Sequence, residues 1–191
     1  MKVVSSLLDP SIVSILHDGG IAVIPTDTVY GLVARAHDET AIKKMYSLKV
    51  REHQPGTIIG YDVVHLHDLG FSRELLDETS SYWPAPLSAV LPANDIAPYL
   101  KADRSDLPVR VPDYDDLLKL LKQTGPLMTT SANLPSEPTA TTIEEAFAYF
   151  GDAIDVYVDG GEVKGHQPST IIRINNGTIT VLRHGAFDLP V

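Results

Sequence analysis

The sequence contains no cysteine among its 191 residues. This absence excludes disulfides, cysteine-ligated zinc, iron–sulfur clusters and thiol nucleophiles, and it fits the cytoplasmic location that we expect. Long apolar runs are also missing. No stretch reaches the roughly 18 residues of a membrane-spanning helix, and Pro10 and nearby charges interrupt the N-terminus before a signal-peptide core could form. We therefore expect no membrane insertion.

Positive charge is scarce as well. The chain has 15 Lys and Arg against 25 Asp and Glu, which gives a formal net charge of −10. Proteins that hold nucleic acid by neutralising phosphates need clustered basic residues, so this balance predicts weak or no direct binding of nucleic acid. Any anion site must be local, and its candidates are the basic residues in polar, Gly- or Pro-rich stretches: Lys49, Arg51, Arg104, Arg110, Lys164 and Arg183.

Several common motifs are absent, namely the P-loop, the G-x-G-x-x-G turn, H-E-x-x-H and G-x-S-x-G. His65 and His67 form the one tight histidine pair, but a spacing of two places them on different faces of a predicted helix. Asp113, Asp115 and Asp116 precede an apolar helical pattern, where the helix dipole favours acids without any metal. The sequence therefore predicts no metal-binding residues.

The elements that the sequence does predict alternate between helix and strand. Asp9-Pro10 begins a helix that stops at Gly19-Gly20, and Asp38 begins a second one. We expect one α/β (α+β) domain over residues 1–191, with a twisted mixed β-sheet and flanking helices. The further predicted helices are 63–69, 72–82, 113–121 and 142–150, the last with a Thr142/Glu145 capping box, and the predicted strands are 21–25, 57–59, 87–91, 108–111, 126–130, 154–158, 169–174 and 178–183.

Polar side chains follow several of these strands. In an open α/β sheet, ligands bind beyond the strand ends. Arg110 lies within a predicted strand, where a buried guanidinium needs an anionic partner. These features favour a phosphorylated, carboxylate-bearing ligand, although turn-forming hydroxyls and arginines paired with acids would give the same pattern. The strand-end residues are Thr26, Asp27 and Thr28, then Thr129, Thr130, Ser131 and Asn133, then Ser169 and Thr170.

Seven motifs in this order resemble the YrdC (TsaC) family of threonylcarbamoyl-AMP synthases, over a match from about Asp9 to Gly185. They are Pro25–Leu32, Lys49–Arg51, Tyr82–Leu87, Pro108–Asp113, Thr130–Leu134, Pro168–Ile172 and Val181–Gly185. The resemblance implies a YrdC-like fold with a concave ligand cavity, in the short form without the extra C-terminal domain of longer members.

It also implies an enzyme, a nucleotidyltransferase that joins L-threonine, bicarbonate and ATP into threonylcarbamoyl-AMP and releases diphosphate. The product serves N6-threonylcarbamoyladenosine at position 37 of tRNA, through downstream threonylcarbamoyl-transfer proteins. With the net charge of −10, we expect weak or no direct tRNA binding by this chain. Mg²⁺ is expected to arrive with ATP. Matched residue by residue, the resemblance assigns Lys49 and Arg51 to catalysis, Thr28, Arg110, Ser131 and Ser169 to threonine, and Lys49, Arg51, Asn133, Thr141 and Arg183 to ATP.

Lys49 continues the apolar helical face of Ile42 and Met45 by one turn. We therefore expect its amine to point into the cavity over the phosphates, and its removal to affect folding little. The segment after Lys49-x-Arg51 departs from the family pattern over Glu52–Thr57, and two family ligand contacts fall on Gly60 and Asp106, so neither is assigned. Two alternatives stay open: a non-catalytic, translation-associated RNA-binding module, and a diverged carbamoyl-adenylate enzyme with another acceptor.

Overall fold

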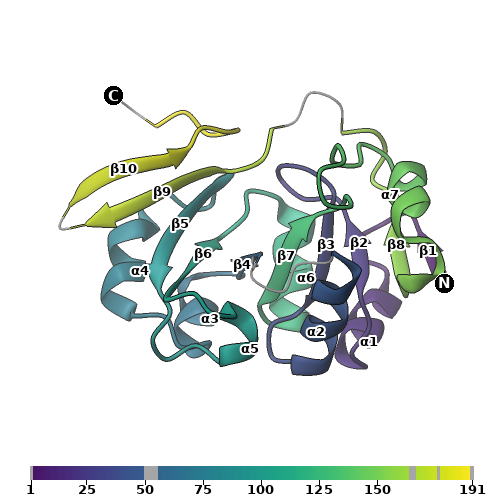
Figure 1. Cartoon of the computed structure of the whole chain (residues 1–191), viewed down its shortest axis with the longest axis horizontal. Helices are drawn as coiled ribbons and strands as arrows, with labels where there is room; N and C mark the ends of the chain where they lie inside the picture. Colours follow the sequence, from purple (N-terminus) through teal and green to yellow (C-terminus); the bar gives the residue numbers. More distant parts are fainter. Residues whose placement is uncertain (1, 50–55, 164–166, 176, 190–191) are drawn as a thin grey trace.

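A mixed β-sheet forms the centre of the molecule (Figure 1). The computed structural model describes residues 2–49, 56–163, 167–175 and 177–189. Within these ranges the sheet has ten strands in the order β1-β8-β2-β3-β7-β4-β6-β5-β9-β10. The strands are β1 (Lys2–Val4), β2 (Ala22–Ile24), β3 (Gly31–Arg35), β4 (Thr57–Ile59), β5 (Leu87–Pro92), β6 (Asp106–Arg110), β7 (Leu127–Ser131), β8 (Val156–Val158), β9 (Thr170–Asn175) and β10 (Thr178–Arg183).

The sheet runs across Figure 1 from the β9–β10 hairpin at one end to β8 and β1 at the other. Four of its pairings are parallel: β1 with β8, β2 with β8, β4 with β6 and β5 with β9. The other five pairings in this order are antiparallel. The α/β class and the mixed sheet predicted from the sequence are therefore confirmed.

Helices cover both faces of the sheet, in two separate apolar clusters. Ile12 and Leu16 of α1 (Pro10–His17) pack with Leu120 of α6 (Asp115–Thr124) against one face, and Met45 of α2 (Glu39–Leu48) packs against the other. Because side chains alternate along a strand, central strands covered on both faces are continuously apolar. The remaining helices are α3 (Val63–Asp68), α4 (Arg73–Ser80), α5 (Pro98–Lys101), α7 (Ile143–Phe150) and the 3₁₀ turn η1 (Gly151–Ala153).

Capping residues set the helix starts that the sequence predicted. The Asp9 carboxylate accepts from the Ser11 N–H at 2.9 Å, and the Asp38 carboxylate accepts from the Ala41 N–H at 2.9 Å. These bonds satisfy N–H groups that have no partner within the helix. In the described part of the chain, no helix is long and apolar enough to cross a membrane.

Four short elements, β1, β3, α5 and the 3₁₀ turn η1, lie where the sequence analysis predicted none. β3 is central, because it pairs with β2 on one side and β7 on the other. It follows the polar segment 26–30 directly and begins with Gly31, which weakens a strand signal. A Cβ at Gly31 would lie 2.7 Å from Thr129 Oγ1, so the neighbouring strand requires a residue without a side chain there.

The alternation of side chains also determines where the site lies. Leu127 of β7 and Ile59 of β4 belong to the cluster beneath α1 and α6. Two residues along each strand, on the same face, are the polar residues Thr129 and Thr57. One sheet face is thus apolar and helix-covered at one end and polar at the other, and the polar end forms a cavity wall.

Candidate functional site

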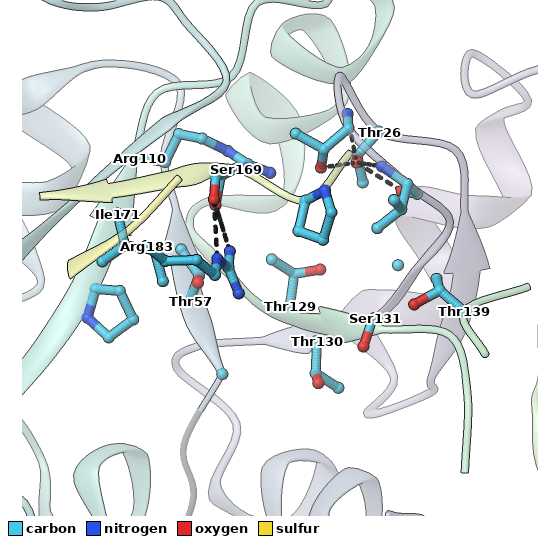
Figure 2. Close-up of a pocket in the computed structure, with 16 residues that line it drawn as sticks. Thr26, Thr57, Arg110, Thr129, Thr130, Ser131, Thr139, Ser169, Ile171 and Arg183 are labelled. Atoms are coloured by element: carbon cyan, nitrogen blue, oxygen red, sulfur yellow. Dashed lines mark hydrogen bonds between the residues drawn. The ribbon is translucent and has the colours of Figure 1, made fainter. Parts of the chain in front are cut away.

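The polar end of this face lines a cavity of about 250 Å³ (Figure 2). Its floor comes from Thr57, which begins β4, and from Thr129 and Ser131 of the neighbouring strand β7. One wall is the loop between β2 and β3, which contributes Thr26 and Thr28, and the opposite wall is formed around Ser169. Loops and strand ends therefore converge here, as ligand sites in α/β sheets do.

Arg110 reaches this cavity from the end of β6 and is paired with a buried acid. Its Nη2 lies 3.1 Å from Asp27 Oδ1, and the two side chains are 4% and 2% exposed. Asp27 Oδ2 also accepts from the Asp113 N–H at 3.2 Å. Among the described residues, Arg110 Nε has no hydrogen-bond partner. The predicted anionic partner of Arg110 is therefore Asp27, and one donor of the guanidinium, the buried Nε, is left without a partner in the described part of the chain.

Burial disfavours the charged form of both Asp27 and Arg110. Removal from water raises the pKa of Asp27, and the Arg110 charge counteracts part of that rise. Burial likewise lowers the pKa of Arg110, against the attraction of Asp27. A ligand carboxylate at the cavity would give Arg110 a second anionic partner and would lower the cost of keeping it charged.

A second guanidinium, that of Arg183 at the end of β10, contacts Ser169 across from Arg110 (Figure 2). Arg183 Nη2 donates to the Ser169 carbonyl at 2.7 Å and to Ser169 Oγ at 3.2 Å. Burial lowers the pKa of Arg183, and the charge of Arg110 lowers it further. The two cations therefore repel each other across one cavity, although the whole chain carries a net charge of −10. This local excess of positive charge favours an anionic ligand.

The loop between β2 and β3 is shaped by the Thr26 hydroxyl. It accepts from the N–H groups of Thr28 and Val29 at 3.1 and 3.2 Å and donates to the Val29 carbonyl at 2.7 Å. Thr26 Oγ1 also lies 3.0 Å from Thr28 Oγ1. Threonine side chains commonly organise tight turns in this way. The turn presents Thr28 to the cavity.

Lys49 lies beneath the loop that follows β7, and its side chain is fully buried. Its ammonium donates to the Ser131 carbonyl at 2.7 Å, to Asn133 Oδ1 at 2.9 Å and to the Asn133 carbonyl. It is not among the residues that line the cavity. The predicted orientation of the Lys49 amine, into the open cavity, is therefore wrong: α2 ends at Leu48, and Lys49 as its C-cap points under β7.

The Asn133 side chain is used within the same loop. Its Nδ2 donates to the carbonyls of Leu134 and Glu137 at 3.0 and 2.7 Å, and its Oδ1 accepts from Ser131 Oγ at 2.6 Å as well as from Lys49. All the hydrogen-bonding capacity of this amide is filled by the protein. Asn133 therefore holds the loop rather than facing the cavity.

The sequence comparison identifies the family. A family model for Sua5, YciO and YrdC proteins, described as "Telomere recombination", matches residues 14–185. The chain belongs to the Sua5/YciO/YrdC family. The match includes all seven motifs on which the resemblance rested, and the resemblance is confirmed.

Relatives of this Sua5/YciO/YrdC chain carry an enzymatic name. A threonylcarbamoyl-AMP synthase of Pyrococcus abyssi is 30% identical over 180 residues, which are 91% of this chain and 53% of that protein. A Mycobacterium tuberculosis protein provisionally named threonylcarbamoyl-AMP synthase is 33% identical over 186 residues, or 92% of this chain and 82% of that protein.

A solved structure of P. abyssi Sua5 complexed with L-threonine has the same fold. Its TM-score is 0.85 at 26% identity, and the match covers 97% of this chain and 58% of that chain. The chain therefore spans little more than half the length of its P. abyssi relative.

The structure brings together five of the site residues assigned through the Sua5/YciO/YrdC resemblance: Thr28, Arg110, Ser131, Ser169 and Arg183 line one cavity. Thr141 is not among the lining residues. Its N–H and hydroxyl donate to Glu145 Oε2 at 2.7 and 3.1 Å. The predicted capping box is thus half correct: the Glu145 N–H donates to Thr142 Oγ1, but the Glu145 carboxylate bonds to Thr141. Arg51 lies outside the described residues.

Some cavity residues were not predicted from the sequence. Thr57 and Thr139 line the cavity, and Ser88 lies behind Ser169 with its Oγ 3.0 Å from Ser169 Oγ. The spacing of two between Thr57 and the apolar Ile59 is the one sequence signal that places Thr57 on this face. Thr139 and Ser88 become neighbours of the site through folding alone.

The described cavity residues do not fit a resident Mg²⁺ site. Mg²⁺ in proteins is usually held by one or two carboxylates together with substrate phosphates. The described lining contains no Asp or Glu, and the nearby Asp27 is occupied by Arg110. Nor does the described part of the chain contain a cluster of three His, Asp or Glu residues able to hold a metal. The described lining therefore offers no resident site for Mg²⁺.

Proposed function

We propose that this chain forms threonylcarbamoyl-AMP and diphosphate from L-threonine, bicarbonate and MgATP. The observation that carries the proposal is the cavity in which the Arg110 and Arg183 guanidiniums meet the hydroxyls of Thr28, Ser131 and Ser169. The names of the P. abyssi and M. tuberculosis relatives and the L-threonine complex of Sua5 support it. We propose that it acts in the cytoplasm and that its product modifies adenosine 37 of tRNA through partner proteins that transfer the threonylcarbamoyl group.

Threonine is assigned to the Arg110 side of the cavity. A guanidinium can bind a carboxylate through two parallel N–H bonds, and Arg110 uses one nitrogen for Asp27. Ser169 lies beside it, and the hydroxyl oxygens of Thr28 and Ser131, which also line the cavity, are assigned to accept from the ammonium and hydroxyl of the amino acid. Because Arg110 is held in place before a ligand arrives, little side-chain entropy is lost on binding.

The chemistry needs no nucleophile from the protein. The threonine amine and bicarbonate form a carbamate and water, and a carbamate oxygen then attacks the α-phosphorus of ATP. The new bond is P–O, the bond to the β-phosphate oxygen breaks, and diphosphate leaves with the electron pair. The protein contributes by bringing two anions together and by stabilising the charge that develops on the phosphates.

ATP is assigned to the Arg183 side of the cavity, together with Arg51. Arg183 is positively charged and is oriented by the Ser169 carbonyl. Lys49 and Asn133 are assigned a structural role instead of a direct contact with ATP. They hold the end of β7, where Ser131 lies, and the loop after it. Thr141 contributes through its bond to Glu145 at the start of α7.

Diphosphate release tests the proposal. Purified protein with MgATP, bicarbonate and L-threonine is expected to release diphosphate, and omission of threonine or bicarbonate is expected to stop the release. L-serine in place of threonine tests the choice of acceptor.

The variant Arg110→Met should lose at least about 100-fold in kcat/KM for threonine, because a bidentate charged contact is removed. Arg104→Met, which removes a half-exposed arginine paired with Asp106, should match wild type. Release that continues without threonine would contradict the proposal.

A further inference from the structure

Ser88 is a buried hydroxyl directly behind the cavity wall. It lies on β5, next to β9, and is 0% exposed. Its Oγ is 3.0 Å from Ser169 Oγ, and either oxygen could be the donor on distance alone. Ser169 itself lines the cavity, whereas Ser88 does not. Ser88 therefore contacts the site through one side chain, that of Ser169.

The partners of the Ser88 hydroxyl decide which of the two oxygens donates. Within the described residues, Ser169 Oγ is the one partner of the Ser88 hydroxyl. If Ser169 donated, the Ser88 proton would be buried without an acceptor, which is unfavourable. Ser88 must therefore donate to Ser169 Oγ.

The Ser169 oxygen then has both of its acceptor positions filled. Arg183 Nη2 can only donate, and it approaches Ser169 Oγ at 3.2 Å (dashed lines in Figure 2). Ser88 supplies the second donor. A hydroxyl oxygen has two lone pairs and one proton, so the Ser169 proton occupies the remaining direction. Since Ser169 lines the cavity between the two arginines, that direction is toward the ligand.

We propose that Ser88 is a positioning residue that, together with Arg183, turns the Ser169 hydroxyl proton into the cavity as a fixed donor to an anionic ligand oxygen. The identity of that oxygen rests on the proposed function, which assigns it to the threonine carboxylate beside Arg110. Ser88 touches no substrate in this scheme. Its effect is transmitted entirely through Ser169, which makes it separable from a general packing role.

The test compares Ser88→Ala, Ser169→Ala and the double variant by steady-state diphosphate release. Ser88→Ala should raise the KM for threonine about three- to tenfold, because a freely rotating Ser169 proton is a weaker donor, and should leave the KM for ATP unchanged. Ser169→Ala should raise the threonine KM about tenfold or more. In the double variant, the Ser88 change should add nothing, because the group through which it acts is absent.

Thr79→Val is the matched control, since it removes another buried hydroxyl, one that is bonded to the Leu75 and Leu76 carbonyls within α4 and not to a cavity residue. It should leave both KM values at wild-type levels. An unchanged threonine KM in Ser88→Ala, equal rises in both KM values, or additive effects in the double variant would overturn the proposal.

A second readout does not depend on enzymatic activity. Neutron diffraction from deuterium-exchanged crystals of the wild-type chain should place the Ser88 deuteron on the line to Ser169 Oγ and the Ser169 deuteron toward the cavity. The opposite arrangement would overturn the positioning role even in an active enzyme. Failure of wild-type protein to release diphosphate, with the deuterons placed as expected, would contradict the proposed reaction and leave the Ser88 inference supported.

Discussion

The Lys49 ammonium donates to Asn133 Oδ1 at 2.9 Å and to the carbonyls of Ser131 and Asn133, so that a fully buried cation joins the end of α2 to the loop after β7. Three oxygens of one loop thus converge on one side chain. A buried ammonium is stable only when its donors are satisfied in this way. Ser131, the last residue of β7, lines the cavity, so Lys49 affects the site from beneath.

Lys49→Met should destabilise the protein by about 1–3 kcal/mol, because it keeps the apolar stem and leaves the three loop oxygens without their donor. Thermal or urea unfolding without ligand measures this change. The sequence-based expectation, that removal of Lys49 hardly affects folding, assumed an amine in an open cavity; the buried amine leads us to expect a loss of stability instead. The same variant should show faster amide hydrogen exchange over residues 131–137.

Lys43→Met is the control for charge removal from the same helix. Lys43 is exposed and pairs with Glu39 at 2.7 Å across one helical turn. Such surface pairs contribute little, so this variant should unfold within about 0.5 kcal/mol of wild type. Equal unfolding midpoints for Lys49→Met and Lys43→Met would show that the buried contacts of Lys49 do not stabilise the loop.

Asp27→Asn should strongly destabilise the ligand-free protein, by about 3–5 kcal/mol, because it leaves the buried Arg110 guanidinium without a countercharge. Saturating L-threonine should then raise the melting temperature of this variant more than that of wild type, since the ligand carboxylate replaces the missing charge. Differential scanning calorimetry with and without threonine measures both effects.

Asp106→Asn removes a carboxylate from a more exposed group, in which Asp106 contacts Arg104 and Arg173. It should cost no more than about 1 kcal/mol and should leave the threonine-induced shift unchanged. A threonine shift in Asp27→Asn that is smaller than in wild type would argue against a ligand carboxylate at Arg110.

Local sequence signals predicted much of the fold. The caps at Asp9 and Asp38 form the expected hydrogen bonds, and the acids Asp115 and Asp116 occupy the first turn of α6, as a helix dipole favours. Their interactions lie within a few residues of sequence. β3 was missed because its evidence is non-local: its stability comes from pairing with β7, about 100 residues away.

The candidate site was predictable where a residue type alone restricts the chemistry. A guanidinium in a strand, Arg110, requires an anion, and the structure supplies Asp27. Lys49 shows the limit of this reasoning. Helical periodicity correctly placed it on the apolar face of α2, but whether that face opens to a cavity or to a loop depends on Ser131 and Asn133, more than 80 residues further along the chain.

The isolated chain should bind tRNA or duplex RNA with a dissociation constant no tighter than about 10⁻⁴ to 10⁻⁶ M at physiological salt, the range of non-specific phosphate contact. The net charge of −10 opposes such contact, and Arg110 faces Asp27 rather than the surface. Fluorescence anisotropy with labelled tRNA at two salt concentrations measures this affinity. Submicromolar binding would favour the RNA-binding alternative over the proposed enzyme.

Gly185 packs against the backbone that carries Ser169, and no side chain fits there. A Cβ at this position would lie 2.1 Å from the Pro168 carbonyl oxygen and 2.6 Å from the Ser169 carbonyl carbon, both backbone atoms. The Gly185 N–H also donates to Thr170 Oγ1 at 3.0 Å, which fixes the two segments together. Gly185→Ala must therefore displace the Ser169 wall, or the C-terminal segment, at a cost of about 1–3 kcal/mol.

This displacement should also raise the KM for threonine, because Ser169 and Arg183 move relative to Arg110. The rise in KM should exceed what the loss of stability alone would explain. Ala186→Ser is the matched control: residue 186 is exposed, and its N–H bond to the Pro168 carbonyl at 2.9 Å does not depend on the side chain. The control should retain both wild-type stability and the wild-type KM. Steady-state diphosphate release and thermal unfolding, measured on the two variants side by side, make the comparison. A Gly185→Ala protein that is destabilised but keeps the wild-type threonine KM would show that the threonine site does not depend on this close contact.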